Sequence, residues 1–187
     1  MNKNLKLFLA LAVCLILSGA MILGGCSKFS SLFPEKMRRY YNADQKFSIQ
    51  LPDSWEKQDG AEGIVFVGVS PVEDSSDVFQ ENINVVSQML PQKIELEKLF
   101  TDNIEQLRSI AKNFFEEERG QTSIAGSDAR WIIFSSGEGQ IQVRILMYMF
   151  LQENRAFAIN CVAISDKFPK YKYTFQRIAK SLRFEKF

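Results

Sequence analysis

An apolar segment near the N-terminus constrains this chain more than any other feature, because it divides an exported leader from the part that folds. Residues 7–23 are almost wholly apolar, and Lys3 and Lys6 precede them with no acidic residue. The small glycines at positions 24–25 follow. A positive stretch, an apolar stretch and small residues in this order are typical of an export signal. The folded part therefore begins after residue 25.

The residue after the two glycines is a cysteine. The run Leu23-Gly24-Gly25-Cys26 resembles the lipobox of bacterial lipoproteins, in which the cysteine thiol takes a diacylglyceryl group and becomes the first residue of the mature protein. The resemblance implies a signal peptide over residues 1–25 and lipidation of Cys26. The alternative is an uncleaved anchor, because residues 7–25 are long enough to span a bilayer. Both readings place the rest of the chain outside the cytoplasm, held at the cell membrane or the outer membrane.

Length and charge indicate one domain and limit its partners. Removing residues 1–25 leaves 162 residues, enough for one domain with a sizeable core. We expect a tether over residues 26–39 and a globular domain over residues 40–187. Without Lys3 and Lys6 the chain has 21 basic and 22 acidic residues. This near-neutral balance argues against nucleic-acid binding.

The chain contains no histidine. This removes Ser-His-Asp and Cys-His catalysis, histidine general bases and histidine-ligated metals. Of the cysteines, Cys14 leaves with the leader and Cys26 would be acylated, so Cys161 has no intrachain partner. Cys161 lies in an apolar strand-like run and is expected to be a buried small side chain. We therefore predict a protein that is not an enzyme and that needs no cofactor.

Hydrophobic periodicity predicts a mixed fold of strands and two helices. Apolar residues at spacings of three and four predict one helix between Leu96 and Phe114 and a second between Phe168 and Leu182. Asp166 is the expected cap of the second helix. Runs of strand character, including one with apolar residues on both faces, cover residues 46–51, 63–70, 82–90, 115–124, 129–135, 140–152 and 155–164.

Three stretches of the domain resemble PsbP-like domains. Residues 47–55 read Phe-Ser-Ile-Gln-Leu-Pro-Asp-Ser-Trp, similar to the family's opening strand, proline and tryptophan. Residues 126–131 resemble its Gly-x-x-Ala/Tyr strand entry, and residues 175–184 its closing helix and Ser-Leu-Arg-Phe tail. The group includes PsbP proteins, Ran-binding Mog proteins and DcrB-like lipoproteins. The resemblance implies an α+β fold, an antiparallel sheet of six or seven strands with helices packed on its faces. It implies no shared function.

Two acidic stretches are candidates for chemistry. Residues 71–77, which we call the acidic loop, contain Glu73, Asp74 and Asp77, and Glu81 follows. Calcium binds such oxygen ligands, but the spacing is not that of an EF-hand and no glycine provides the sharp turn. We expect a solvated loop and no metal, with these three carboxylates as weak candidates. The other stretch, residues 116–118, is three glutamates in a row, which we interpret as a surface turn.

The last helix has a strongly basic side. Its basic residues avoid the apolar stripe, and no acidic residue lies between Lys167 and Arg183. An ordinary solvated face would show the same pattern. The alternative is a contact surface for an acidic partner or for anionic lipid headgroups. The candidate contact residues are Lys170, Tyr173, Arg177 and Lys180.

Trp55 and Trp131 are expected to fill core or rim positions. The sequence thus predicts a membrane-anchored accessory module that binds another envelope protein. A lipoprotein that binds a small ligand or a divalent cation is the first alternative, and an enzyme with a site free of histidine is the second.

Overall fold

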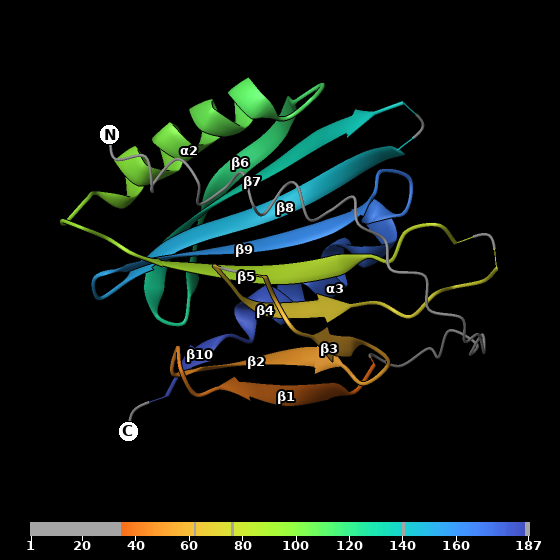
Figure 1. The fold of residues 1–187 in the computed structure, drawn as a ribbon, viewed down its shortest axis with the longest axis horizontal. Helices are drawn as coiled ribbons and strands as arrows, with labels where there is room; N and C mark the ends of the chain where they lie inside the picture. Colours follow the sequence, from red (N-terminus) through yellow and green to blue (C-terminus); the bar gives the residue numbers. More distant parts are fainter. Residues whose placement is uncertain (1–34, 62, 76, 140, 186–187) are drawn as a thin grey trace.

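The computed structural model describes residues 35–61, 63–75, 77–139 and 141–185. The predicted leader and Cys26 lie outside the described residues. These residues form an α+β fold with a large and a small antiparallel sheet and two helices (Figure 1). The α+β class and the antiparallel sheet with helices on its faces are confirmed.

The large sheet has seven strands in the order β3-β4-β5-β9-β8-β7-β6. Its strands are β3 (Glu56–Gln58), β4 (Ile64–Val69), β5 (Asn82–Met89), β6 (Phe115–Ile124), β7 (Ser127–Glu138), β8 (Ile141–Gln152) and β9 (Arg155–Ile164). Each neighbouring pair is antiparallel. The strands from β6 to β9 follow one another through tight turns. The first of these turns contains Ala125 and Gly126, both with positive φ, a pairing typical of a two-residue hairpin turn.

The small sheet has three strands in the order β1-β2-β10. They are β1 (Met37–Asn42), β2 (Phe47–Pro52) and β10 (Arg183–Phe184), and they lie beside the large sheet (Figure 1). Three of the ten strands were not predicted. β1 begins inside the stretch assigned to the tether, and β3 and β10 have three and two residues. Strands of two or three residues are too short to show an alternating hydrophobic pattern, and they form by pairing with a neighbouring strand.

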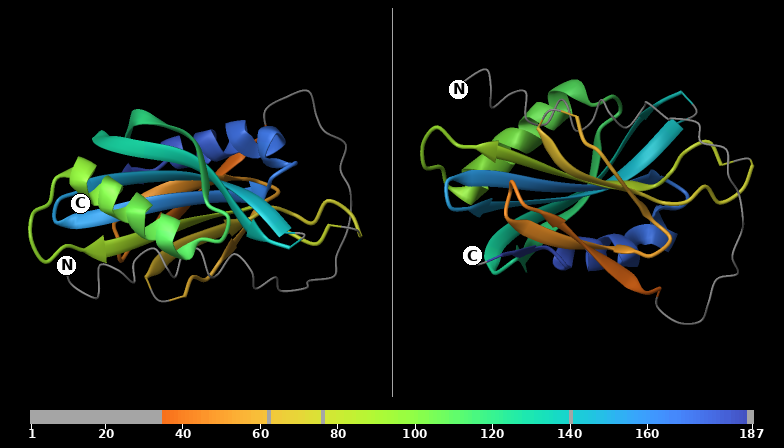
Figure 2. Two further views of the ribbon diagram at one scale, coloured as in Figure 1. Left: turned by 90° about the horizontal axis from the view of Figure 1, so that it is seen from above. Right: turned by 60° about the horizontal axis from the view of Figure 1, so that its bottom comes forward.

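The helices pack on opposite faces of the large sheet (Figure 2). On one face, α2 (Leu96–Ile110) buries Leu99, Phe100, Ile104 and Leu107. On the other face, α3 (Phe168–Lys180) buries Phe168, Tyr171, Phe175, Ile178 and Ala179. The apolar stripe predicted for α3 is therefore confirmed. Its core cluster also contains Phe47, Ile49 and Leu51 of β2, so α3 packs against both sheets.

The first helix is shorter than predicted. It ends at Ile110, which is exposed, and Asn113 then adopts a positive φ of 53°. Phe114 lies beyond the helix, where its ring stacks on Phe134. Sequence periodicity assigned Phe114 to the helix because it lies four residues after Ile110. That spacing in the sequence does not show that the helix has already ended.

The predicted cap of the last helix is wrong. The N-cap is Lys167, and no side chain bonds to the first turn there. Pro169 occupies the second helical position and has no N–H to donate to a capping oxygen. Pro169 therefore marks the start of this helix and at the same time removes one N–H group that a capping side chain would accept from.

A bulge in β4 changes the predicted faces of that strand. Simple alternation places Ile64 and Phe66 on the same face. The register shifts between these two residues. As a result Ile64 packs in the cluster under α2, while Phe66 packs in the cluster under α3.

Aromatic packing in the α3-side core should dominate stability. Phe157 is 1% exposed and its ring contacts those of Phe150, Phe47 and Phe184. We expect Phe157→Ala to lower the free energy of unfolding by about 3–5 kcal/mol. Phe115, which is 65% exposed, is the matched control, and Phe115→Ala should change stability by less than about 0.5 kcal/mol. Denaturant titration of both variants checks this, and equal losses would contradict the assigned core.

Candidate functional site

The charged residues of α3 divide into two groups with different partners. The first half of the helix and the residues before it carry Lys167, Lys170 and Lys172. The second half carries Arg177 and Lys180, and Arg183 follows as the first residue of β10. The two groups look alike in the sequence, because no acidic residue lies between Lys167 and Arg183. In the part of the chain that the structure describes, the fold brings carboxylates into ion pairs with the first group and not with the second.

The acidic loop lies against the start of α3. Glu73 accepts hydrogen bonds from Lys170 Nζ and from the Tyr171 hydroxyl, both at 2.5 Å. Lys167 Nζ donates to Asp77 at 2.7 Å and lies 3.5 Å from Glu73. The Asp77 side chain is only 4% exposed. The prediction of a solvated loop is therefore wrong for Glu73 and Asp77, whose charges are balanced by lysines some ninety residues away in sequence.

These contacts shift the pKa of the groups involved. Burial alone would raise the pKa of Glu73, but the hydrogen bonds from Lys170 and Tyr171 outweigh it and lower that pKa. Burial and the same carboxylate raise the pKa of the Tyr171 hydroxyl. Tyr171 therefore stays protonated and holds the loop as a hydrogen-bond donor.

A fourth carboxylate lies beneath this cluster. Glu81 is fully buried, and its Oε1 has no hydrogen-bond partner within the described structure. Its Oε2 accepts from the Ser70 hydroxyl at 3.4 Å. Burial raises the pKa of Glu81, although the positive charge of Lys167 opposes the rise. Lys167 thus supplies the positive charge that a cation would otherwise provide to Glu73, Asp77 and Glu81.

The described residues contain no group of three or more carboxylate or cysteine side chains arranged to hold a metal ion. Of the weak candidates, Glu73 and Asp77 are engaged with α3, and Asp74 lies exposed in the same loop. The arrangement of the acidic loop therefore favours a structural role, the attachment of the loop to α3.

The three consecutive glutamates lie in the strand predicted over residues 115–124, and the surface turn that we also expected for them is wrong. They occupy β6, where a bulge between Glu116 and Glu118 disturbs the alternation of side chains. Glu116 pairs with Arg108 and Arg119, which lower its pKa chiefly through the Arg119 hydrogen bond. Glu117 pairs with Arg144, and Glu118 lies 3.6 Å from Lys172. Each carboxylate has its own cation, so the glutamates form no acid–base pair.

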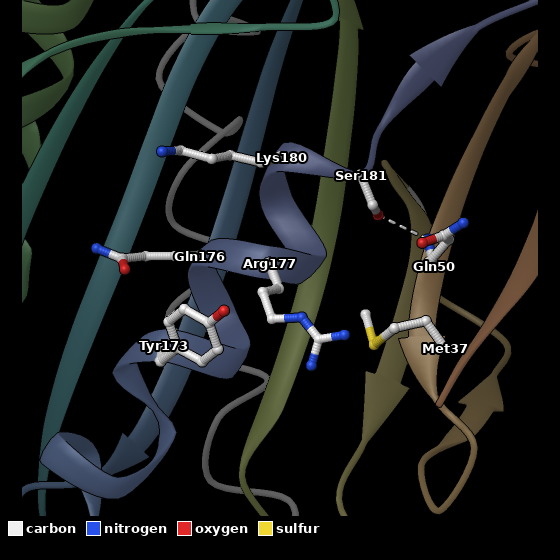
Figure 3. A pocket seen from close by; sticks show the side chains of 7 residues that line it. All are labelled: Met37, Gln50, Tyr173, Gln176, Arg177, Lys180 and Ser181. Carbon is white, nitrogen blue, oxygen red and sulfur yellow. Dashed lines mark hydrogen bonds between the residues drawn. The ribbon is translucent and has the colours of Figure 1, made fainter. Parts of the chain in front are cut away.

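The second half of α3 borders a groove beside the small sheet (Figure 3). We call it the β1-side groove. Its volume is about 310 Å³, and it is lined by Met37, Gln50, Tyr173, Gln176, Arg177, Lys180 and Ser181. Arg177 extends towards Met37, whereas Gln176 and Lys180 extend towards the other side of the helix (Figure 3). The Ser181 hydroxyl accepts a hydrogen bond from the backbone N–H of Gln50 and so joins the end of α3 to β2.

A second groove follows the opposite side of α3, next to the edge strand of the large sheet. We call it the β6-side groove. Its volume is about 270 Å³, and it is lined by Glu118, Gln121, Thr122, Trp131, Ile133, Leu146, Tyr148, Lys172, Gln176 and Lys180. Gly120 allows Trp131 to lie here, because a Cβ atom at this position would come within 2.7 Å of the indole ring. Trp131 is half-buried at the rim, and Trp55 is buried in the core, as predicted.

The remaining chemical groups are enclosed. Cys161 is fully buried and burial raises its thiol pKa, so it is a core side chain, as predicted. Burial also raises the pKa of the Tyr148 hydroxyl. Neither group is poised as a nucleophile or base, since both are held in the protonated form.

Of the four predicted contact residues, the structure brings three together. Tyr173, Arg177 and Lys180 line the β1-side groove, whereas Lys170 is bound to Glu73. Sequence reasoning missed Met37 and Gln50, which come from strands far away in the chain. It also missed the β6-side groove, because Gly120 and Trp131 become neighbours only through the register of β6 and β7.

The comparisons with known proteins identify the fold. No family model and no curated protein matches the sequence. Cyanobacterial PsbP (CyanoP) from Synechocystis has a TM-score of 0.61 at 15% identity, with 87% of this chain and 99% of that chain covered. LpqN of Mycobacterium tuberculosis has a TM-score of 0.63 at 12% identity, covering 81% and 91%. The Ran-binding protein Mog1p of Saccharomyces cerevisiae has 0.55 at 9%, covering 81% and 96%. The chain thus has a PsbP/Mog-like fold.

Within the described residues, neither helix is long and apolar enough to cross a membrane.

The raised pKa of Glu81 predicts a specific pH dependence. In the unfolded chain Glu81 titrates near its ordinary value of 4.5, and in the folded protein it titrates higher. Its stabilising contribution is therefore complete below pH 4.5 and decreases as the pH rises through the folded pKa. We expect Glu81→Gln to be more stable than the wild type at neutral pH and equal to it below pH 4.5.

Chemical unfolding of both proteins across this pH range measures the difference. Glu73 and Lys167 are present in both proteins, so their titration contributes to both curves. A variant that is less stable than the wild type at neutral pH would show that the Glu81–Lys167 attraction exceeds the cost of burial.

Proposed function

We propose that the chain is a lipid-anchored accessory domain outside the cytoplasm, which binds another protein of the cell envelope and catalyses no reaction. The observation that carries this proposal is the β6-side groove. It presents the half-buried Trp131 beside Lys172 and Lys180, over a floor that includes the buried ring of Tyr148, whereas the thiol is buried and the carboxylates of the acidic loop and of β6 are paired with basic side chains. Tryptophan and tyrosine in partly desolvated pockets are typical of the residues that dominate binding between proteins.

The position of this groove suits a segment of a partner protein. β6 is the last strand of the large sheet, so among the residues that the structure describes its outer edge has no neighbouring strand. Extended peptides bind to such edges through their backbones while nearby pockets take alternate side chains. The groove lies alongside this edge and offers an aromatic and aliphatic floor with two lysines. A partner segment with an apolar and an acidic side chain would complement it.

The related structures support the general role. LpqN is involved in cell envelope biogenesis, and Mog1p is a Ran-binding protein. Proteins of one fold act through different surfaces, so the partner of this chain is assigned from its own groove.

A substitution in the groove tests the partner site. Thr122 opposes Ala129 in the register of β6 and β7, on the side packed against α3, and it lines the groove. We expect Thr122→Arg to fill the groove and weaken partner binding by about 2 kcal/mol or more, as for a binding hot spot. Co-purification of the native lipidated protein from its own membranes, with quantification of the recovered partner, measures the loss.

The neighbouring residue provides the control for this experiment. Ser123 is exposed and points to the opposite face of the same strand. Ser123→Arg adds the same side chain and charge but should retain the partner. Equal recovery with both variants would place the partner elsewhere on the protein.

The anchor is tested separately by mass spectrometry. We expect the mature native chain to begin at Cys26 and to carry a diacylglyceryl group on its thiol. Two or three acyl chains make attachment effectively permanent, because each buried methylene contributes about 0.8 kcal/mol. Cys26→Ser should abolish both the modification and the cleavage before residue 26. An unmodified thiol in the native protein would contradict the proposed anchor.

A further inference from the structure

Six residues form one outer surface along the small sheet and the second half of α3. We call it the basic surface: Arg39, Tyr41, Tyr173, Arg177, Lys180 and Arg183. Residues that oppose each other in antiparallel strands point to the same side. Tyr41 and Arg183 both oppose Ser48, so they lie on one face of the small sheet. Arg39 lies on that face too, since its guanidinium donates to the Ser48 hydroxyl.

The β1-side groove connects this face to the helix. Met37 shares a face of β1 with Arg39 and Tyr41, at alternate positions along the strand. Met37 also lines the groove together with Tyr173 and Arg177 (Figure 3). The strands and the helix therefore present a continuous surface.

Within the described residues, none of the four basic side chains of this surface forms an ion pair with a carboxylate. Arg177 donates to the backbone oxygen of Glu35, and Arg183 donates to the backbone oxygens of Lys180 and Leu182. Neutral oxygens leave the positive charge of these guanidinium groups uncompensated. The first half of α3 differs, because its lysines are paired with Glu73, Asp77 and Glu118.

Two exposed tyrosines accompany these charges. Tyr41 is 67% exposed and Tyr173 is 66% exposed. The guanidinium of Arg177 lies 5.9 Å from the centre of the Tyr173 ring. Tyrosine is enriched where proteins meet the headgroup region of a membrane, since its ring and hydroxyl suit an environment that is apolar on one side and wet on the other.

The chain enters the domain at the edge of this surface. The backbone oxygen of Glu35 accepts from Arg177, and its carboxylate accepts from the backbone N–H of Ser54 at 2.9 Å. The backbone oxygen of Lys36 accepts from Asp53 at 2.9 Å. Eight residues lie between Cys26 and Glu35, and a fully extended chain from one to the other spans about 30 Å. An acyl anchor at Cys26 would therefore keep the basic surface close to the lipid headgroups.

We propose that the basic surface docks on anionic phospholipid headgroups of the membrane in which the chain is anchored. The orientation of the domain rests on the proposed anchor, and the choice of an anionic partner rests on the uncompensated charges of the basic surface. Docking turns the surface of β1 and α3 towards the bilayer and holds the domain in one orientation. An acidic protein is the alternative occupant, and the experiment below distinguishes it.

Vesicle co-sedimentation of a chain that starts at Ser27 tests the surface without the anchor. Such a chain keeps the complete core, because both core clusters consist of residues between Met37 and Phe184. We expect binding to vesicles of equal parts phosphatidylglycerol and phosphatidylcholine, and none to phosphatidylcholine alone. High salt should abolish the binding, since it screens exposed charges.

Neutralising two of the charges should weaken this binding strongly. Each basic residue near an anionic surface contributes about fivefold in affinity, so Arg177→Gln with Arg183→Gln should lose about 25-fold. The matched control is Lys93→Gln with Lys98→Gln, which removes the same charge near the start of α2, on the opposite face of the large sheet. The control should bind as the wild type does.

Three results would overturn the docking proposal: no binding to anionic vesicles, equal binding to neutral ones, or equal loss in the control and the test variant. A test variant that binds vesicles normally but loses its partner in co-purification would assign the surface to an acidic protein instead.

Failure of the anchor has a separate readout, the mass of the native chain. An unmodified Cys26 together with charge-dependent vesicle binding would refute the anchor and leave the docking surface standing.

Discussion

The packing of α3 between two sheets is the constraint on which the rest of the structure depends. Its apolar stripe contacts the large sheet on one side and β2 on the other. Both ends of the helix are held by polar contacts. The acidic loop binds the first turns through Lys167, Lys170 and Tyr171, and Ser181 bonds to Gln50 at the last turn. With the helix fixed in this way, the two grooves beside it and the basic surface keep a defined shape.

This arrangement also divides the charges of the helix into two roles. Two lysines, Lys167 and Lys170, hold the acidic loop, and Lys172 lies beside Glu118 of β6. Lys167 also offsets part of the cost of burying Glu81. Arg177 and Arg183 donate to neutral backbone oxygens and form no ion pair within the described residues, so their charges are available to a partner or a surface. A helix that looks uniformly basic in sequence therefore carries an internal contact at one end and an external contact at the other.

The two proposals assign the two sides of α3, which share Lys180 at their border, to different partners. The β6-side groove, with its aromatic floor and adjacent strand edge, suits a segment of a protein. The basic surface, next to the entry of the anchored chain, suits lipid headgroups. A domain that lies on the membrane through β1 and α3 would present β6 along its flank, accessible to another envelope protein. The fold is shared with CyanoP, LpqN and Mog1p, but the charged and aromatic residues that carry these proposals belong to this chain.

The sequence by itself determined the α+β class, the stripe of α3, the burial of Cys161 and the absence of histidine chemistry, because each depends on residue type or on a local period. The tertiary structure alone decided which charges are free, since Glu73 and Asp77 reach Lys167 and Lys170 from across the chain. It decided the short strands β1, β3 and β10, which exist through pairing. It also decided the bulges at Ile64 and Glu116, whose side-chain directions no alternating pattern predicts. Local rules act between neighbours in sequence, whereas the grooves are built by residues that only the fold makes neighbours.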